Sequence, residues 1–122
     1  MSHVKPFMTP KMYPAVPISN GGRRVTVTGP INWDTGSDPQ EIAAVFTLVV
    51  SQISPNGGVV SAIGWATTTY TNEADWSARA NVVGPASLEF VPGGATVAAW
   101  ATIAHSDGGY AIYEWTLPVL LQ

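Results

Sequence analysis

Three residue types of a hydrolytic triad stand side by side in His105-Ser106-Asp107. A triad needs a nucleophile, a base and an acid that converge on one point from separate segments of the chain. Adjacent side chains on a turn point apart instead, and the following Gly108-Gly109 is typical of a turn. We therefore interpret residues 105–109 as a turn and expect no hydrolase activity from them.

Three carboxylates, Asp34, Asp38 and Glu41, lie close together in a segment that is predicted to be a loop. Clustered oxygen ligands of this kind suit hard cations such as Ca²⁺. Their spacing matches no calcium-loop motif, however, and Asp38 and Glu41 are also typical of the first turn of a helix, which predicts a short helical turn over 39–44. We therefore expect no metal site, and the three carboxylates are the second-choice candidate for one.

Another pair of acids, Glu73 and Asp75, lies beside Trp76, as in a sugar-cleaving site. The two carboxylates of a glycosidase must flank the substrate, whereas these two belong to one short turn. The chain also contains no cysteine, which excludes thiolate metal sites, cysteine nucleophiles and disulfides. The sequence therefore predicts a protein that is not an enzyme and that has no cofactor.

Charge divides the chain into a basic N-terminal arm and an acidic body. Four of the five basic residues lie in the first 24 positions, where no acid occurs; all eight acids follow, with Arg79 as their one base. Four prolines keep the start extended, so we predict an arm of residues 1–22 and one domain of residues 23–122. The arm is expected to lie on a neighbouring subunit through Lys5, Phe7, Met8, Lys11, Met12, Tyr13, Arg23 and Arg24.

The body consists of short alternating segments that are separated by turn residues, which predicts an all-β fold. Seven strands are expected, at residues 24–29, 43–52, 59–70, 76–83, 87–91, 95–104 and 110–121. This number and spacing are typical of an antiparallel β-sandwich of the immunoglobulin type. A jelly roll or a closed β-barrel is the alternative.

Alternation along the predicted strands separates the five tryptophans into two groups. Trp76 and Trp115 share their faces with apolar residues and are expected in the core. The other three lie in a loop or on faces with threonine and alanine, and we expect them to be partly exposed. With two polar neighbours they give a candidate binding surface of Asn32, Trp33, Asp34, Trp65 and Trp100.

Charged residues make up only 11% of the chain, against about 25% in an ordinary soluble domain. The net charge of −3 argues against binding to nucleic acid, which needs a basic face. Lysine, which commonly guards sheet edges against pairing, is absent after Lys11. Such a surface is tolerable in a protein that is covered by copies of itself.

These features favour a non-catalytic structural or interaction protein. It would form a homo-oligomer or a larger ordered assembly through its arm and its weakly charged sheet surface. The alternatives are a glycan-binding module that stacks sugars on exposed tryptophans, and a binder of small hydrophobic ligands or an enzyme with a pocket between the sheets. With no signal peptide or transmembrane segment visible, we expect a cytoplasmic protein or one assembled into a particle.

Overall fold

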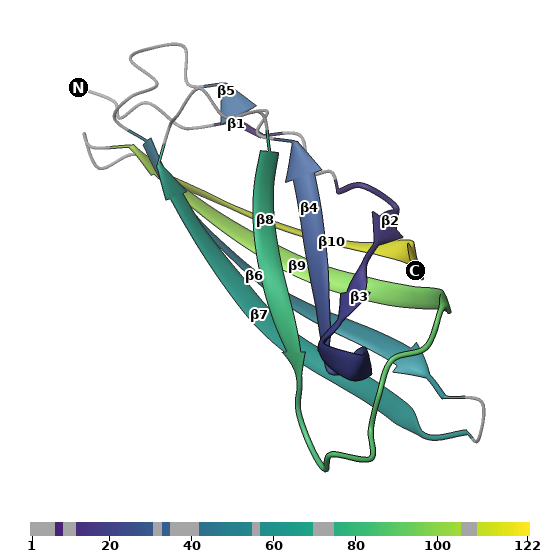
Figure 1. Ribbon diagram of the computed structural model, residues 1–122. Helices are drawn as coiled ribbons and strands as arrows, with labels where there is room; N and C mark the ends of the chain where they lie inside the picture. The colour runs from purple at the N-terminus through teal and green to yellow at the C-terminus, as the bar shows by residue number, and fades with distance from the viewer. Residues whose placement is uncertain are drawn as a thin grey trace.

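The computed structural model describes residues 7–8, 12–30, 33–34, 42–54, 57–69, 75–105 and 110–122. These residues form β-strands and no α-helix, and a single 3-10 turn covers Asn20–Gly22. The strands are β1 (Phe7–Met8), β2 (Ala15–Val16), β3 (Ile18–Ser19), β4 (Arg24–Pro30), β5 (Trp33–Asp34), β6 (Ile42–Ile53), β7 (Val59–Thr69), β8 (Asp75–Val82), β9 (Gly93–His105) and β10 (Tyr110–Leu121). β1 and β5 pair with each other at one end of the molecule, and the other strands form one large sheet (Figure 1).

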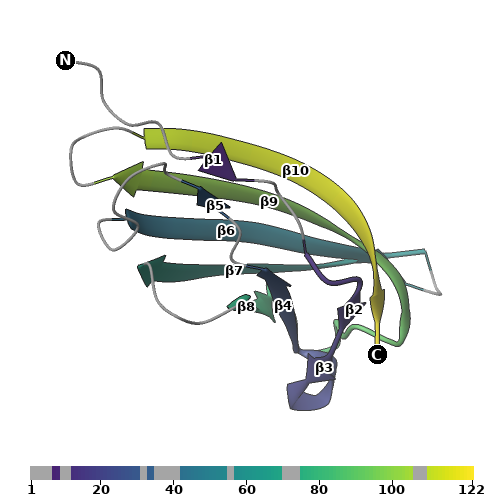
Figure 2. The same ribbon diagram turned by 90° about the horizontal axis from the view of Figure 1, so that it is seen from above.

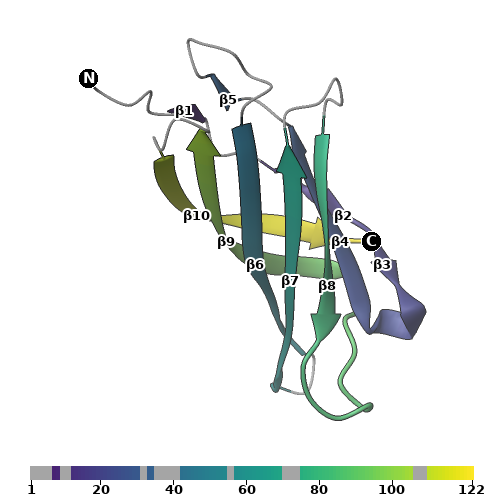
Figure 3. The same ribbon diagram turned by 90° about the vertical axis from the view of Figure 1, so that its left-hand side faces the viewer.

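The large sheet is bent into a nearly closed barrel (Figures 2 and 3). Its strand order is β2-β10-β9-β6-β7-β8-β4-β3, and only the pair β2–β10 is parallel. β2 and β3 stand at the two ends of this order, yet only Pro17 separates them in the chain. The two edges of the sheet therefore meet on one continuous segment, which closes the barrel.

Residues 12–19, which we call the closing segment, hydrogen-bond to β4 on one side and to β10 on the other. Pro14 and Pro17 suit this position because they supply carbonyl acceptors and have no N–H group to satisfy. The backbone bonds that close the barrel are Tyr13 N–H to Thr28 O (2.8 Å), Thr26 N–H to Pro17 O (3.1 Å), Leu120 N–H to Pro14 O (2.7 Å), Gln122 N–H to Val16 O (3.0 Å) and Ile18 N–H to Gln122 O (2.9 Å). Much of the predicted arm is thus part of the barrel wall of its own chain.

The barrel interior is filled by side chains from alternate positions of the long strands. Phe46 and Trp76 stack with their ring centroids 4.5 Å apart and their planes 12° apart. Alanines lie opposite Phe46 on both neighbouring strands, Ala66 on β7 and Ala101 on β9, and their small side chains leave room for the rings. Trp76 is confirmed as a core residue, since it is only 2% exposed, whereas Trp115 is partly buried against the margin of the core.

The structure confirms the all-β class. A single sheet that closes on itself supports the barrel alternative rather than the immunoglobulin-like sandwich, in which two separate sheets pack face to face. Of the helical turn predicted over 39–44, residues 39–41 lie outside the described part of the chain, and β6 begins at Ile42.

The prediction of a strand over 87–91 is wrong, because this segment is a loop that other groups hold in place. The Arg23 guanidinium donates to the carbonyl oxygens of Pro85 and Leu88 at 2.8 and 2.7 Å. The Phe90 side chain is buried, and its N–H group donates to Gly22 O at 2.8 Å. This loop therefore contributes Phe90 to the core, with Leu88 packed against it.

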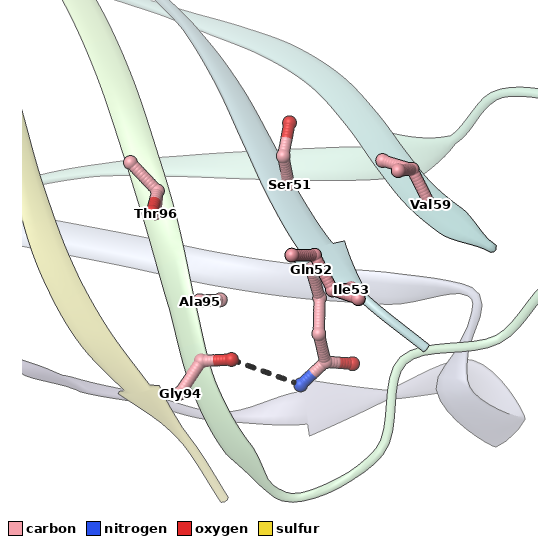
Figure 4. Close-up of a pocket in the computed structure, with 7 residues that line it drawn as sticks. All are labelled: Ser51, Gln52, Ile53, Val59, Gly94, Ala95 and Thr96. Atoms are coloured by element: carbon pink, nitrogen blue, oxygen red, sulfur yellow. Dashed lines mark hydrogen bonds between the residues drawn. The ribbon is translucent and has the colours of Figure 1, made fainter. Parts of the chain in front are cut away.

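Gln52 is the only buried polar side chain in the described part of the chain. Its Nε2 group donates to Val91 O at 2.8 Å and to Gly94 O at 3.3 Å, and its Oε1 atom accepts the Val91 N–H group at 3.0 Å. Figure 4 shows the bond to Gly94. The amide of Gln52 thus ties the end of β6 to the start of β9.

Replacing Gln52 with leucine is expected to lower the free energy of unfolding by about 1–3 kcal/mol, because buried polar groups lose their partners. Urea denaturation followed by tryptophan fluorescence measures this loss. Gln52→Glu is the matched variant: it keeps the size and the acceptor for Val91 N–H, but an ionised carboxylate cannot donate to the two carbonyls. A Gln52→Leu protein as stable as the wild type would refute this role.

Candidate interaction surface

The outer face of the barrel carries one row of side chains that runs across neighbouring strands. We call it the central row. The strand register places Glu114 opposite Trp100, Trp100 opposite Thr47, Thr47 opposite Trp65, and Trp65 opposite Arg79. Adjacent strands lie about 4.8 Å apart, so the backbones at Trp65 and Trp100 are about 10 Å apart with Thr47 between them. The row crosses β10, β9, β6, β7 and β8, which lie side by side in Figure 3.

Apolar side chains flank the central row on the same outer face: Ala98, Val49 and Ile63 on one side, and Ile112 and Val45 on the other, where Thr102 and Thr67 alternate with them. Together with the two tryptophans and Thr47 they form what we call the outer apolar face: Val45, Thr47, Val49, Ile63, Trp65, Ala98, Trp100 and Ile112. The most exposed of them are Trp65 (70%), Ile112 (63%), Ile63 (47%), Val45 (44%) and Trp100 (40%). Contiguous exposed apolar surface of this kind usually marks a binding site in a soluble protein.

Opposite charges stand at the two ends of the central row. Glu114 lies on β10 and Arg79 on β8, and both are exposed. The indole Nε1 group of Trp100 donates to Glu114 Oε2 at 3.1 Å, which orients the ring toward β10. A shallow hollow of about 230 Å³ lies beside this pair. The face is thus apolar at its centre, acidic at one margin and basic at the other.

The structure brings together two members of the predicted binding surface, Trp65 and Trp100. Trp33 and Asp34 form β5, which pairs with β1, but only their backbone is described. Asn32 lies outside the described residues, as do Asp38 and Glu41 of the second-choice metal site. No group of three acidic or histidine side chains that could hold a metal ion occurs within the described ranges.

The residues predicted to hold a neighbouring subunit occupy several different places. Phe7 and Met8 form β1, whereas Lys5 and Lys11 lie outside the described residues. Met12 is buried in the core of its own chain. Their role between subunits stays a prediction.

Three further residues of that predicted set bond within the chain. Tyr13 OH donates to Asp75 Oδ1 at 2.6 Å, and this hydrogen bond raises the pKa of the tyrosine hydroxyl. Arg24 Nε donates to Asn81 Oδ1 at 2.9 Å. Arg23, as described above, holds the loop at 84–88. The side chains of this part of the chain thus stabilise the barrel itself.

The apolar residues around the two tryptophans were missed by the sequence analysis. Residues 43–52 are apolar on both faces, a pattern that is typical of a strand buried on both sides. In the barrel only one face of β6 is covered, so Val45 is exposed. The signal was present in the sequence, because the same doubly apolar pattern also fits a strand whose outer face binds a partner.

Comparison with protein-family models, curated proteins and solved structures gives no match to this chain. Among the described residues, no helix has the length and apolar character needed to cross a membrane.

Proposed function

We propose that this protein is a non-catalytic interaction protein that associates with copies of itself through the outer apolar face. One observation carries the proposal: five large apolar side chains on adjacent strands are at least 40% exposed, with charges only at the margins of their rows. Complete burial of such a side chain contributes about 1.5–3 kcal/mol. Several of them together can outweigh the loss of translational and rotational freedom on association.

The closing segment changes how assembly is expected to occur. Residues 12–19 pair with both edges of their own sheet, so they are not free to reach another subunit. Self-association is therefore expected through the weakly charged sheet surface and not through the arm. This face offers a rigid platform because it is formed by the long central strands β6, β7 and β9, each of which is paired on both sides.

A glycan-binding module is the second candidate, since Trp65 and Trp100 are exposed on either side of Thr47 in one row. Sugars stack on aromatic rings, but they also need several polar groups around the ring. Here Thr67 and Thr102 are polar neighbours of the two rings, but the other neighbouring positions are the apolar Val45, Val49, Ile63 and Ala98. The composition of the face thus favours a protein partner.

Replacing Trp65 with lysine is expected to weaken self-association strongly, because it removes the most exposed ring of the face and places a charge inside the contact. The dissociation constant should rise at least tenfold, as measured by sedimentation equilibrium. Ser19→Lys is the matched control, since Ser19 is exposed on β3, away from the outer apolar face. A wild-type protein that remains monomeric at high concentration would refute the proposal, and a fluorescence change on adding oligosaccharides would then favour glycan binding.

A further inference from the structure

The central row has a symmetry that bears on how a second copy would bind. Read from β10 to β8 it runs acid, tryptophan, threonine, tryptophan, base: Glu114, Trp100, Thr47, Trp65, Arg79. The row is therefore symmetric in shape about Thr47 and opposite in charge at its two ends. A surface with this pattern is complementary to itself when one copy is reversed along the row.

A two-fold axis that lies between two facing sheets, parallel to β6 and above Thr47, produces this reversal. Under this rotation Thr47 faces Thr47 of the second copy, and Trp65 faces Trp100 of the second copy. Arg79 then faces Glu114 of the second copy at both margins. An axis along the row instead would place Arg79 against Arg79, which like charges disfavour.

The next row along the strands fits the same axis. It consists of Thr116, Ala98, Val49, Ile63 and Asn81. Reversal places the large side chain of Ile63 against the small Ala98 of the second copy, and the polar Asn81 against Thr116. Large-on-small contacts and matched polar margins are features of well-packed interfaces.

We propose that the protein forms a two-fold dimer in which β6 of each copy lies at the centre, with Thr47 on the axis and Arg79 paired with Glu114 of the other copy. This inference rests on the proposed self-association and adds its geometry. The two outer faces would pack face to face as aligned sheets, and an axis parallel to β6 keeps the two β6 strands parallel to each other.

Cross-linking tests the position of the axis. The chain contains no cysteine, so Thr47→Cys introduces a single thiol, at an exposed site. Facing sheets lie about 10 Å apart, and a short bismaleimide spans this gap. We expect most of the Thr47→Cys protein to be cross-linked as a dimer. Thr116→Cys is the control: it is also exposed, but β10 lies two strands from β6, so its two copies would be displaced sideways by about 19 Å.

Charge reversal tests the direction of the axis. Arg79→Glu and Glu114→Arg should each weaken association by about tenfold, because each places like charges together at both margins. The double variant restores opposite charges, so its dissociation constant should return to within about threefold of the wild-type value. An equimolar mixture of the two single variants should also associate, since every contact in the mixed dimer joins opposite charges.

The outcomes separate this inference from the proposal on which it rests. A dimeric wild type with efficient Thr47→Cys cross-linking and restored association in the double variant supports both. A dimer that is not cross-linked through Thr47→Cys, or whose double variant is weaker than either single variant, refutes the geometry and leaves self-association intact. A monomeric wild type refutes both.

Discussion

Replacing Gly64 with alanine is expected to destabilise the barrel strongly, although it adds a single carbon atom. Gly64 lies on the buried face of β7 opposite Ala80 of β8. A Cβ atom at this position would lie 2.2 Å from the carbonyl oxygen of Arg79 and 2.8 Å from the Cα atom of Ala80. Both are backbone atoms, so no side-chain rotation can relieve the clash, and β7 and β8 would have to move apart.

Overpacking of a core usually costs about 1–3 kcal/mol, and a clash with backbone places Gly64→Ala at or above the upper end of that range. Urea denaturation of purified protein measures the loss. Gly94→Ala is the matched control: it adds the same atom in β9 at an exposed position, where a Cβ atom would have no neighbour within 4 Å. Equal stability of the two variants would show that the strands separate easily at Gly64, contrary to this account.

Replacing Val16 with aspartate should be more damaging still. The Val16 side chain is completely buried in the core, and its backbone belongs to β2, the strand that completes the barrel beside β10. A carboxylate at this site would be buried without a partner, which costs about 4 kcal/mol or more. We expect the variant to be largely unfolded at room temperature, so that it loses the native tryptophan fluorescence and the β-sheet circular dichroism signal.

The adjacent residue provides the control for Val16. Ala15 belongs to the same strand but is exposed, so Ala15→Asp should change the free energy of unfolding by less than about 0.5 kcal/mol. The comparison also tests whether the closing segment is part of the fold. If residues 12–19 only rested on the surface, both substitutions would be tolerated.

The long strands could be predicted from the sequence because each follows a regular alternation or a β-branched run. β4, β6, β7, β8, β9 and β10 begin and end within a few residues of the predicted bounds. The barrel closure could not be predicted, because the parallel pairing of Ala15 with Leu120 joins residues at opposite ends of the sequence. No local pattern records such a contact.

The interaction surface was predictable only in part. Alternation placed Trp65 and Trp100 outward, but their closeness depends on the register of three strands, in which both lie opposite Thr47. The loop at 87–91 was mistaken for a strand because its apolar residues Leu88 and Phe90 alternate with polar ones. Its true position depends on Arg23, which lies far away in the sequence.

The position of the closing segment between the two edges of the sheet affects how the chain folds during synthesis. Residues 12–19 find their partners on one side only when Leu120 and Gln122 are available. A nascent chain on the ribosome therefore carries an open sheet until residue 122 has emerged from the exit tunnel. Until then the apolar lining remains accessible, which makes this interval the period of greatest risk of aggregation.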